Sequence, residues 1–413
     1  EHEDLVKEME NKAFYGMTSF DNDPYTTYMS SEEMEEFSTG INMNYVGIGV
    51  QYSKYDDLAV VEKVFKNSPA EKAGILSGDV LLSVDGQPIG GLSTTEIRER
   101  VIGPEGSEVR IGISRAGEET ELVCIRGTVD SSVYAWKEDD YVILELNSFG
   151  NLTGKECIKY LDEYTDVDRI IIDLRDNTGG YQSSVKEVCG LFIGSNKVYL
   201  RQRDVNGIET EDYTSASRYY ENFGKIVLLV NESTASAAEV FTICLKEQHP
   251  DVTIVGTTTF GKGVIQTNHL LNNGGVLKMT AYYWLSPNGV SIHGTGIEPD
   301  EEVYLADIAY EYYGMMEEDE VWVEDSVSDY TRIAQLSLRY LGYDIKREDG
   351  YFDEAFKDIL NEYRKQKGLE TAEVLDSACY RSIISDVVKT LNSDSEKDYQ
   401  LVRAKEILNG NQY

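Results

Sequence analysis

The sequence predicts a multidomain α/β protein. It would consist of a helical lead-in, a β-rich module, an α/β core on a mostly parallel sheet, and a small all-α module at the C-terminal end. Short β-like runs fill residues 44–128, strands and helices alternate over residues 141–300, and amphipathic helical segments follow residue 330. Such alternation is typical of a parallel sheet with helices on both faces. The 413 residues suffice for about two to four domains of roughly 100–200 residues each.

The N-terminal part of the chain divides where the residue pattern changes from helical to β-like. Residues 1–43 carry a weak helical pattern, the turn-rich stretch DNDPYTTYMS and the acidic stretch SSEEMEEF, so we expect a helical segment. Residues 44–128 contain the runs GIGVQY, LAVVEKV, DVLLSVDG, EVRIGISR and ELVCIRG, interrupted by SPAEKAGILSGD and by one helical stretch, STTEIRERV. Short strands between turn signals predict a compact β module.

The α/β core and the helical module follow. Within residues 129–315, the runs YVILELNSF, RIIIDL, KIVLLV and TIVG predict strands, and TGKECIKYLDEY and SVKEVCGLF predict helices. Ligands of such sheets bind at the carboxyl ends of the strands. The charged residues 316–329 predict an acidic linker. Residues 330–413 hold three amphipathic helical segments joined by Gly-containing turns.

Charge and cysteine content exclude several classes of function. The formal net charge of −36 repels phosphate backbones, so we expect no nucleic-acid partner. The five cysteines have no CxxC spacing, and the sequence has no paired histidines, which favours buried free thiols and no metal or other cofactor. They are Cys124, Cys157, Cys189, Cys244 and Cys379. No apolar run is long enough to span a bilayer. Because the chain opens with EHEDLVKEME, we expect any signal or anchor segment to precede it.

Two small-residue turns follow predicted buried strands, in RIIIDLRDNTGG and in KIVLLVNESTASAAE. Both turns should emerge at the same edge of the sheet. If a helix begins near Ser236, the amides of Ser236 and Ala237 lie unpaired in its first turn and can stabilise an oxyanion. Gly179 and Gly180 can supply a second donor, since glycine lets a backbone N–H turn toward a ligand. The pattern predicts a serine nucleophile beside an oxyanion hole.

A nucleophilic serine needs a base, and the sequence favours a lysine. Lys262 lies between two glycines in TTTFGKGVIQ, and burial in apolar surroundings would lower its pKa toward neutrality. No histidine sits in a glycine-framed turn at a strand end; the four are His2, His249, His269 and His293. Gln266 would lie about 13 Å from Lys262 in an extended strand. If Gln266 orients the lysine, we expect a helical turn.

Each feature by itself has a simpler interpretation. A serine at a helix start is commonly an N-cap, a lysine between glycines is commonly an exposed loop residue, and DNTGG is most simply a turn. All three occur in order and in register with predicted strands, and this combination favours a catalytic site.

These segments resemble those of the bacterial C-terminal processing peptidases, the tail-specific serine proteases that use a Ser-Lys dyad. The resemblance covers roughly residues 1–305 and rests on GMTSFDNDPYTTYMS, VGIGVQY, SPAEKAGILSGDVLLSVDGQPI, IIDLRDNTGG, NESTASAAE, TTTFGKGVIQ and SPNGVSIHGTGIEPD. It implies a nucleophile, a general base and an orienting partner, which are Ser236, Lys262 and Gln266 respectively. It implies an oxyanion hole made by Gly179, Gly180 and Ala237.

Residues 44–128 resemble the PDZ domain that these peptidases carry, most specifically through SPAEKAGILSGDVLLSVDG. The resemblance implies that the backbone of one loop captures a terminal carboxylate while the substrate tail adds to the sheet as a strand. The residues of that loop are Gly47, Ile48, Gly49 and Val50.

One position departs from the family pattern. Many members have an arginine immediately before a GKKGT-like turn, and this chain has Ile102 before GPEGS. The resemblance implies that such an arginine links peptide capture to assembly of the active site. The substitution therefore predicts weaker coupling, with Arg98 and Arg100 as the alternative carriers of that role.

Residues 330–390 resemble the small three-helix peptidoglycan-binding domain through IAQLSLRYLGY and DGYFDEAFKDILNEYRKQKGL. The same pattern suits a homodimer contact, and the sequence leaves both open. We predict an extracytoplasmic, secreted or membrane-tethered bacterial serine endopeptidase, acting on protein or peptide substrates with a free apolar C-terminus. The alternatives are a catalytically silent PDZ peptide-binding scaffold and a cell-wall adaptor.

Overall fold

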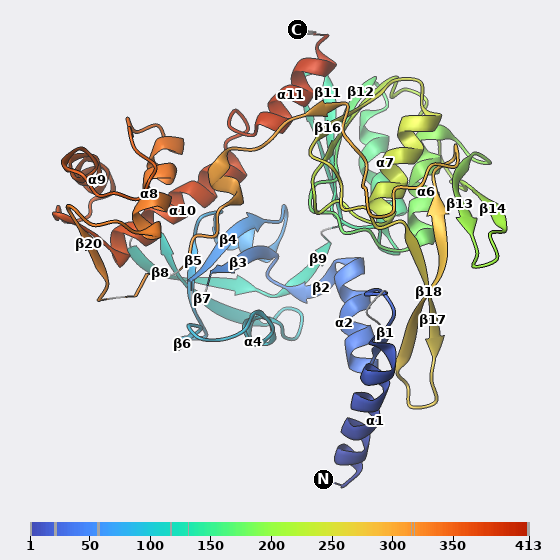
Figure 1. Cartoon of the computed structure of the whole chain (residues 1–413), viewed down its shortest axis with the longest axis horizontal. Helices are drawn as coiled ribbons and strands as arrows, with labels where there is room; N and C mark the ends of the chain where they lie inside the picture. Colours follow the sequence, from blue (N-terminus) through green and yellow to red (C-terminus); the bar gives the residue numbers. More distant parts are fainter. Residues whose placement is uncertain are drawn as a thin grey trace. The chain divides into compact units, whose positions relative to one another are not determined.

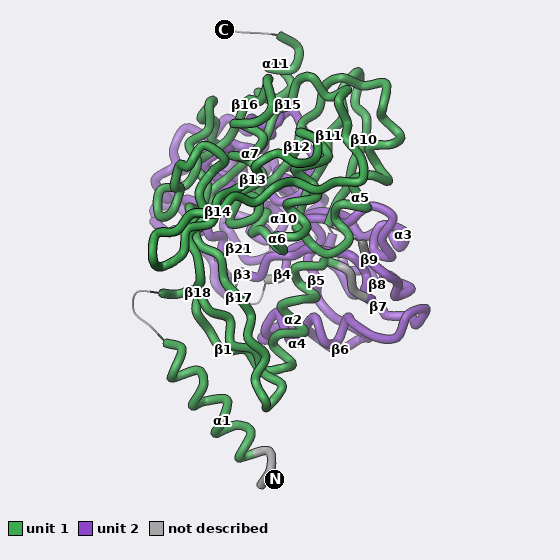
Figure 2. Tube along the Cα trace, turned by 90° about the vertical axis from the view of Figure 1, so that its right-hand side faces the viewer, with its two compact units in different colours: residues 1–44, 130–304, 403–413 green, residues 45–129, 305–402 purple. Residues whose placement is uncertain are grey.

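The computed structural model describes residues 2–19, 23–55, 58–115, 118–130, 132–314, 316–317 and 319–410. Residues 20–22, part of the predicted N-terminal turn, lie outside the described residues. The chain forms two compact units (Figure 2). Unit 1 comprises residues 1–44, 130–304 and 403–413, and unit 2 comprises residues 45–129 and 305–402.

A six-stranded sheet forms the centre of unit 1 (Figure 1). Its strands, in spatial order, are β10 (Val133–Glu138), β11 (Tyr141–Leu146), β12 (Arg169–Asp173), β15 (Lys225–Val230), β16 (Val252–Gly256) and β19 (Glu301–Glu302). β10 and β11 are antiparallel, and every neighbouring pair from β11 to β19 is parallel. The apolar runs of β12 and β15 are almost fully buried, as expected for strands covered on both faces.

Three helices connect these strands: α5 (Thr153–Leu161), α6 (Gln182–Ile193) and α7 (Ala237–Gln248). A 3-10 turn, η1 (Asp162–Tyr164), follows α5. The helices and the sheet share one apolar core. At its centre Phe241 of α7 contacts the rings of Phe149 and Phe192. This packing fixes α7 against the sheet, and with it the turn that leads into α7.

A second, antiparallel sheet of unit 1 carries the N-terminal segment. Its order is β1 (Thr27–Met29), β18 (Val276–Leu285), β13 (Val198–Arg203) and β14 (Glu209–Tyr213), and β17 (Val264–Leu270) also pairs with β18. Helices α1 (His2–Thr18) and α2 (Ser31–Asn42) flank β1 beside the β17–β18 hairpin (Figure 1). The Thr280 hydroxyl donates to Asp23 at 3.0 Å, and the Thr280 N–H donates to the Thr26 hydroxyl at 3.0 Å. The N-terminal segment is thereby attached to β18.

The β-rich part of unit 2 is a sheet in the order β3 (Val50–Tyr55), β4 (Leu58–Val64), β5 (Val80–Val84), β7 (Glu108–Arg115) and β8 (Glu118–Ile125). The short β6 (Gln87–Pro88) pairs with β5, and β2 (Asn44–Gly47) pairs with β9 (Gly127–Asp130). Two short helices, α3 (Pro69–Ala73) and α4 (Thr94–Val101), begin after Ser68 and Ser93. Each serine side chain accepts from a backbone N–H three residues on, which satisfies the first turn of its helix.

The C-terminal part of unit 2 contains η2 (Asp307–Tyr310), α8 (Asp329–Tyr340), α9 (Glu354–Lys367) and α10 (Ser377–Ser393), and α11 (Tyr399–Leu408) follows. The prediction of an all-α module is wrong, because β20 (Val321–Val323) and β21 (Val374–Asp376) pair antiparallel. β20 lies within the stretch predicted as a linker. The charged sequence around β20 does not indicate a strand, because the pairing partner that stabilises it is about 50 residues away.

The helices and the β-rich part of unit 2 share a hydrophobic core. Val60 of β4 and Val80 of β5 are buried in the same cluster as Phe352, Leu360 and Ile384. The Ser385 hydroxyl also donates to the carbonyl of Gly78. Removal of either part would therefore expose apolar surface on the other.

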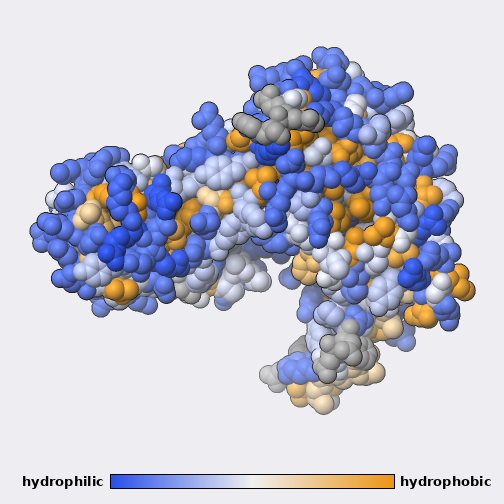
Figure 3. Space-filling model, turned by 45° about the horizontal axis from the view of Figure 1, so that its top comes forward, coloured by the Kyte–Doolittle hydropathy of each residue, from blue (hydrophilic) through white to orange (hydrophobic). Residues whose placement is uncertain are grey.

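Among the described residues, no helix combines the length and apolarity that a membrane span needs. The face shown in Figure 3 is mostly hydrophilic, with scattered apolar side chains, as the charge of −36 leads one to expect.

Candidate active site

Ser236 occupies a sharp turn between β15 and α7. Its backbone has φ 56° and ψ −117°, a conformation that L-residues rarely adopt and that is concentrated at functional sites. α7 begins at the next residue, Ala237. The Ala235 N–H donates to the carbonyl of Asn177 at 2.9 Å, which joins this turn to the one after β12. The predicted helix start at Ser236 is confirmed.

The glycine pair lies directly against this turn. Gly179 has φ 105° and Gly180 has φ 147°. A Cβ atom on Gly179 would lie 2.9 Å from the Cβ atom of Ser236, and one on Gly180 would lie 2.4 Å from the carbonyl oxygen of Phe149. Only glycine permits both approaches. The N–H of Gly179 already donates to Oδ1 of Asn177 at 2.9 Å, so Gly179 has no amide to offer an oxyanion in this arrangement.

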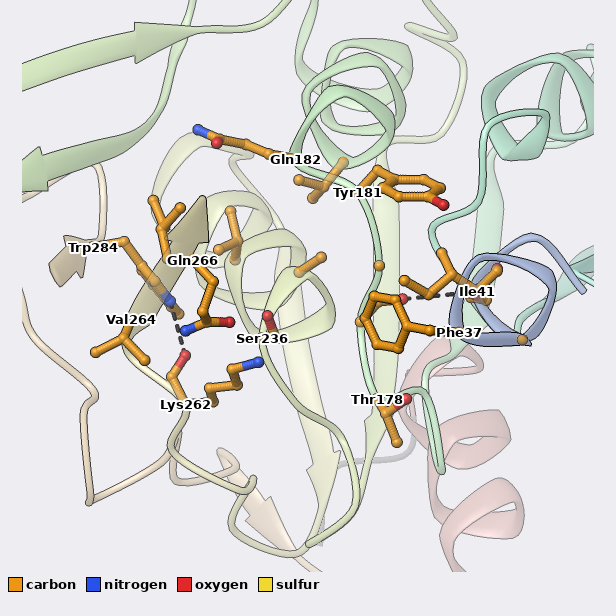
Figure 4. A pocket seen from close by; sticks show the side chains of 18 of the residues that line it. Phe37, Ile41, Thr178, Tyr181, Gln182, Ser236, Lys262, Val264, Gln266 and Trp284 are labelled. Atoms are coloured by element: carbon orange, nitrogen blue, oxygen red, sulfur yellow. Dashed lines mark hydrogen bonds between the residues drawn. The ribbon is translucent and has the colours of Figure 1, made fainter. Parts of the chain in front are cut away.

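Lys262 lies in the loop between β16 and β17, and its side chain points toward Ser236 (Figure 4). The Nε1 atom of buried Trp284 donates to the Lys262 carbonyl at 2.8 Å. The Lys262 ammonium position lies 5.0 Å from the centre of the Tyr25 ring. Burial lowers the pKa of Lys262, while the carboxylate of Glu239 opposes part of this shift. A lysine with such a pKa is poised to act as a base.

Gln266 lies on β17, so the expectation of a helical turn between Lys262 and Gln266 is wrong. The β17–β18 register shifts between Ile265 and Gln266. Such a bulge changes the direction of the following side chains, and both Gln266 and Lys262 line the pocket around Ser236. Nε2 of Gln266 is buried without a hydrogen-bond partner among the described residues.

Glu239 connects the serine turn to the lysine loop, and we did not predict this residue to be functional. It is fully buried on the first turn of α7. Its Oε2 atom accepts from the N–H groups of Ser236 at 2.8 Å and Lys262 at 2.9 Å. Its Oε1 atom accepts from the Thr259 hydroxyl and the Gly261 N–H, both at 2.6 Å. The sequence signal was available, because Ser-x-x-Glu at a helix start is a capping-box pattern.

All six residues predicted for catalysis line one cavity of about 600 Å³. They are Ser236, Lys262, Gln266, Gly179, Gly180 and Ala237. The N-terminal segment contributes apolar walls through Phe37, Ile41 and Met43. A second lysine, Lys278 of β18, also lines the cavity. His249, His269 and His293 do not line it, and the side chain of His2 lies outside the described residues.

Within the described part of the chain, no group of three or more His, Cys, Asp and Glu side chains could hold a metal ion. The five cysteines are buried and free. Burial raises the pKa of Cys124 to about 11 and that of Cys379 to about 12. Both thiols are therefore poor nucleophiles.

The predicted peptide-binding loop joins β2 to β3. The carbonyls of Ile48 and Gly49 accept from the N–H groups of Ala70 at 2.8 Å and Phe65 at 3.1 Å. Gly49 has φ 81°, and a Cβ atom there would lie 2.4 Å from that of Ser68. β3 is an edge strand, paired only with β4 among the described strands. An edge of this kind can accept an added strand.

Ile102 ends α4 and is partly exposed. Of the two alternative arginines, Arg100 donates to the carbonyl of Pro88 at 3.0 Å. A third arginine, Arg126, contacts the end of α4, and we did not predict a role for it from the sequence. It is buried and donates to the carbonyl of Val101 at 2.7 Å. Arg126 thus fixes the end of α4.

Comparison with known proteins places this site in a family. Residues 140–303 match the model of peptidase family S41, and residues 60–115 match that of a PDZ domain. The carboxy-terminal processing protease CtpA of Bacillus subtilis is 31% identical over 401 residues, which cover 96% of this chain and 84% of that protein. This chain belongs to peptidase family S41. It is a serine-type C-terminal processing peptidase with a PDZ domain.

Two further similarities agree with this assignment. The peptidase is 30% identical to the carboxy-terminal processing protease CtpB of Bacillus subtilis over 402 residues, covering 95% of this chain and 82% of that protein. Its fold is similar to that of a putative S41 protease from Bacteroides fragilis, with a TM-score of 0.50, 16% identity, and coverage of 70% of this chain and 82% of that one. The predicted enzyme class and PDZ domain are confirmed.

Proposed function

We propose that this peptidase cleaves protein tails through an acyl-enzyme formed on Ser236, with Lys262 as the general base. One observation carries the proposal. Ser236 and Lys262 face each other in a single cavity in which burial lowers the pKa of the lysine. A neutral amine can take the hydroxyl proton as the oxygen attacks the scissile carbonyl.

The following steps use the same groups. The oxyanion that forms is stabilised by the N–H groups of Ala237 and Gly180, because Gly179 donates to Asn177. Protonated Lys262 gives its proton to the leaving amine as the C–N bond breaks. Water then attacks the acyl-enzyme, with Lys262 again taking a proton. Lys262 returns this proton to the Ser236 oxygen as the ester C–O bond breaks and the product with its new C-terminus leaves. Gln266 lies beside both residues (Figure 4), and we assign it the role of orienting the side chain of Lys262.

Substrate capture belongs to the β-rich part of unit 2. The edge of β3 and the loop from Gly47 to Val50 suit an extended tail that ends in a carboxylate, through backbone pairing. We infer substrates with a free, apolar C-terminus, and an extracytoplasmic location from the family resemblance. The helices of unit 2 complete its hydrophobic core, which gives them a structural role, and we propose no ligand for them.

Digestion of an unfolded protein with a free apolar tail tests this function. We expect fragments that lack the tail, identified by mass spectrometry, and cleavage about tenfold slower when the tail is amidated, since one charge-assisted hydrogen bond is lost. Tail binding without cleavage would instead support a silent scaffold. Equal rates for the free and the amidated tail would contradict carboxylate capture.

The activity should rise with pH. Lys262 is active only when neutral, so kcat/KM is low below its pKa and increases as the proton leaves. Because burial lowers that pKa, the rising limb should lie below the value of about 10.4 for a free lysine. A pH series of kcat/KM with a short peptide measures this limb. Activity that falls between roughly pH 6 and pH 9, the working range of such a base, would exclude the mechanism.

A further inference from the structure

Lys278 is a second amine in the catalytic cavity, and the mechanism does not use it. It lies on β18, between Asn268 of β17 and Thr27 of β1 in the sheet register. The charged residues that line the cavity are Lys262, Lys278 and Asp176. The Asp176 carboxylate accepts from Nδ2 of Asn231 at 2.9 Å. Of the described residues that line the cavity, Lys278 is therefore the one cation without a catalytic role.

Lys278 has no carboxylate partner within the described part of the chain. Its ammonium position lies 4.2 Å from the centre of the Phe37 ring, and Lys278 itself is half-buried. Burial, together with the charge of nearby Lys262, lowers the pKa of Lys278 to about 8. Keeping an unpaired amine in a partly apolar cavity is costly, and the cost falls when an anion enters.

We propose that Lys278 binds a carboxylate of the peptide substrate inside the catalytic cavity. The inference rests on the proposed function, because the cavity must first admit a peptide. A peptide offers carboxylates and no other common anion. The protein carries a net charge of −36, so an acidic group approaches against a repulsive field unless a local cation compensates it. Lys278 supplies that cation in the cavity that Ser236 also lines.

The carboxylate has two sources, the free α-carboxylate of the tail or an Asp or Glu side chain near the scissile bond. One arm of the experiment compares peptides with a free and an amidated C-terminus. The other arm compares Asp with Asn, and Glu with Gln, at each position around the cleavage site. The measured quantity is the ratio of kcat/KM between the charged peptide and its neutral isostere.

In the wild type we expect a ratio of about ten in one arm, which corresponds to about 1.4 kcal/mol. In Lys278→Met the ratio in that arm should fall several-fold, toward one for a side-chain carboxylate and toward the contribution of the PDZ domain for the tail carboxylate, and Lys278→Arg should retain it. Lys155→Met is the matched control. Lys155 is exposed on α5 and does not line the cavity, so its replacement removes the same charge outside the cavity. Capture of the tail by the PDZ domain contributes equally to both enzymes, so the change in ratio isolates Lys278.

Two results would overturn the inference. The first is a wild-type ratio near one in both arms, which needs no variant. The second is a ratio that stays unchanged in Lys278→Met. If the wild type cleaves and Ser236→Ala does not, either result removes only the role of Lys278. If the wild type cleaves none of the peptides, the proposed function itself fails.

Discussion

Replacing Ser236 by alanine, or Lys262 by methionine, should abolish peptide cleavage while the protein stays folded. We expect kcat/KM to fall by at least about 10⁴-fold in each variant. The serine supplies the oxygen of the acyl-enzyme. The side chain of Lys262 points toward Ser236, and burial lowers the pKa of this lysine. Methionine keeps the length and apolar body of lysine and removes the base.

The double variant should be no worse than either single variant, because the two residues act as one unit. Cleavage of a fluorogenic peptide gives the rates, and denaturant unfolding verifies the fold. Lys155→Met serves as the charge-matched control, with an expected rate equal to that of the wild type. Substantial activity in Lys262→Met would exclude the lysine base, and His293 should then be tested, since it lies at the Gly263 amide.

Replacing Glu239 by glutamine should damage both stability and activity. Each carboxylate oxygen of Glu239 accepts two hydrogen bonds, from the serine turn and from the lysine loop. An amide group presents a donor in place of one oxygen, so two buried donors lose their acceptor in either orientation. We expect a loss of about 2–4 kcal/mol in the free energy of unfolding. We also expect kcat to fall by at least about a hundredfold, because small displacements of catalytic groups are costly.

Urea unfolding and single-turnover rates measure these two effects. Glu163→Gln is the matched control, because Glu163 is exposed on η1 and should leave both quantities unchanged. Wild-type stability in Glu239→Gln would show that the four contacts do not hold the two segments together. Lost stability with unchanged kcat would restrict Glu239 to a folding role.

Much of the site could be predicted because its parts are local in sequence. NESTASAAE follows a buried apolar run, which places Ser236 at a helix start, and the flanking glycines mark the loop that holds Lys262. The position of Gln266 was less predictable. A bulge in the β17–β18 register orients it, and a bulge depends on the partner strand.

The sequence by itself determined the α/β alternation of the core, the nucleophile and the base, because apolar period and turn chemistry are properties of neighbouring residues. Only the tertiary structure decided which amides stay free, since Gly179 donates to the side chain of Asn177, whose Nδ2 in turn donates to the carbonyl of Leu146 on the neighbouring strand β11. It also decided that Glu239 joins two loops more than 20 residues apart and that Lys278 shares the catalytic cavity. These features arise where segments distant along the chain meet, and their free energies depend on burial and on partners that no local pattern encodes.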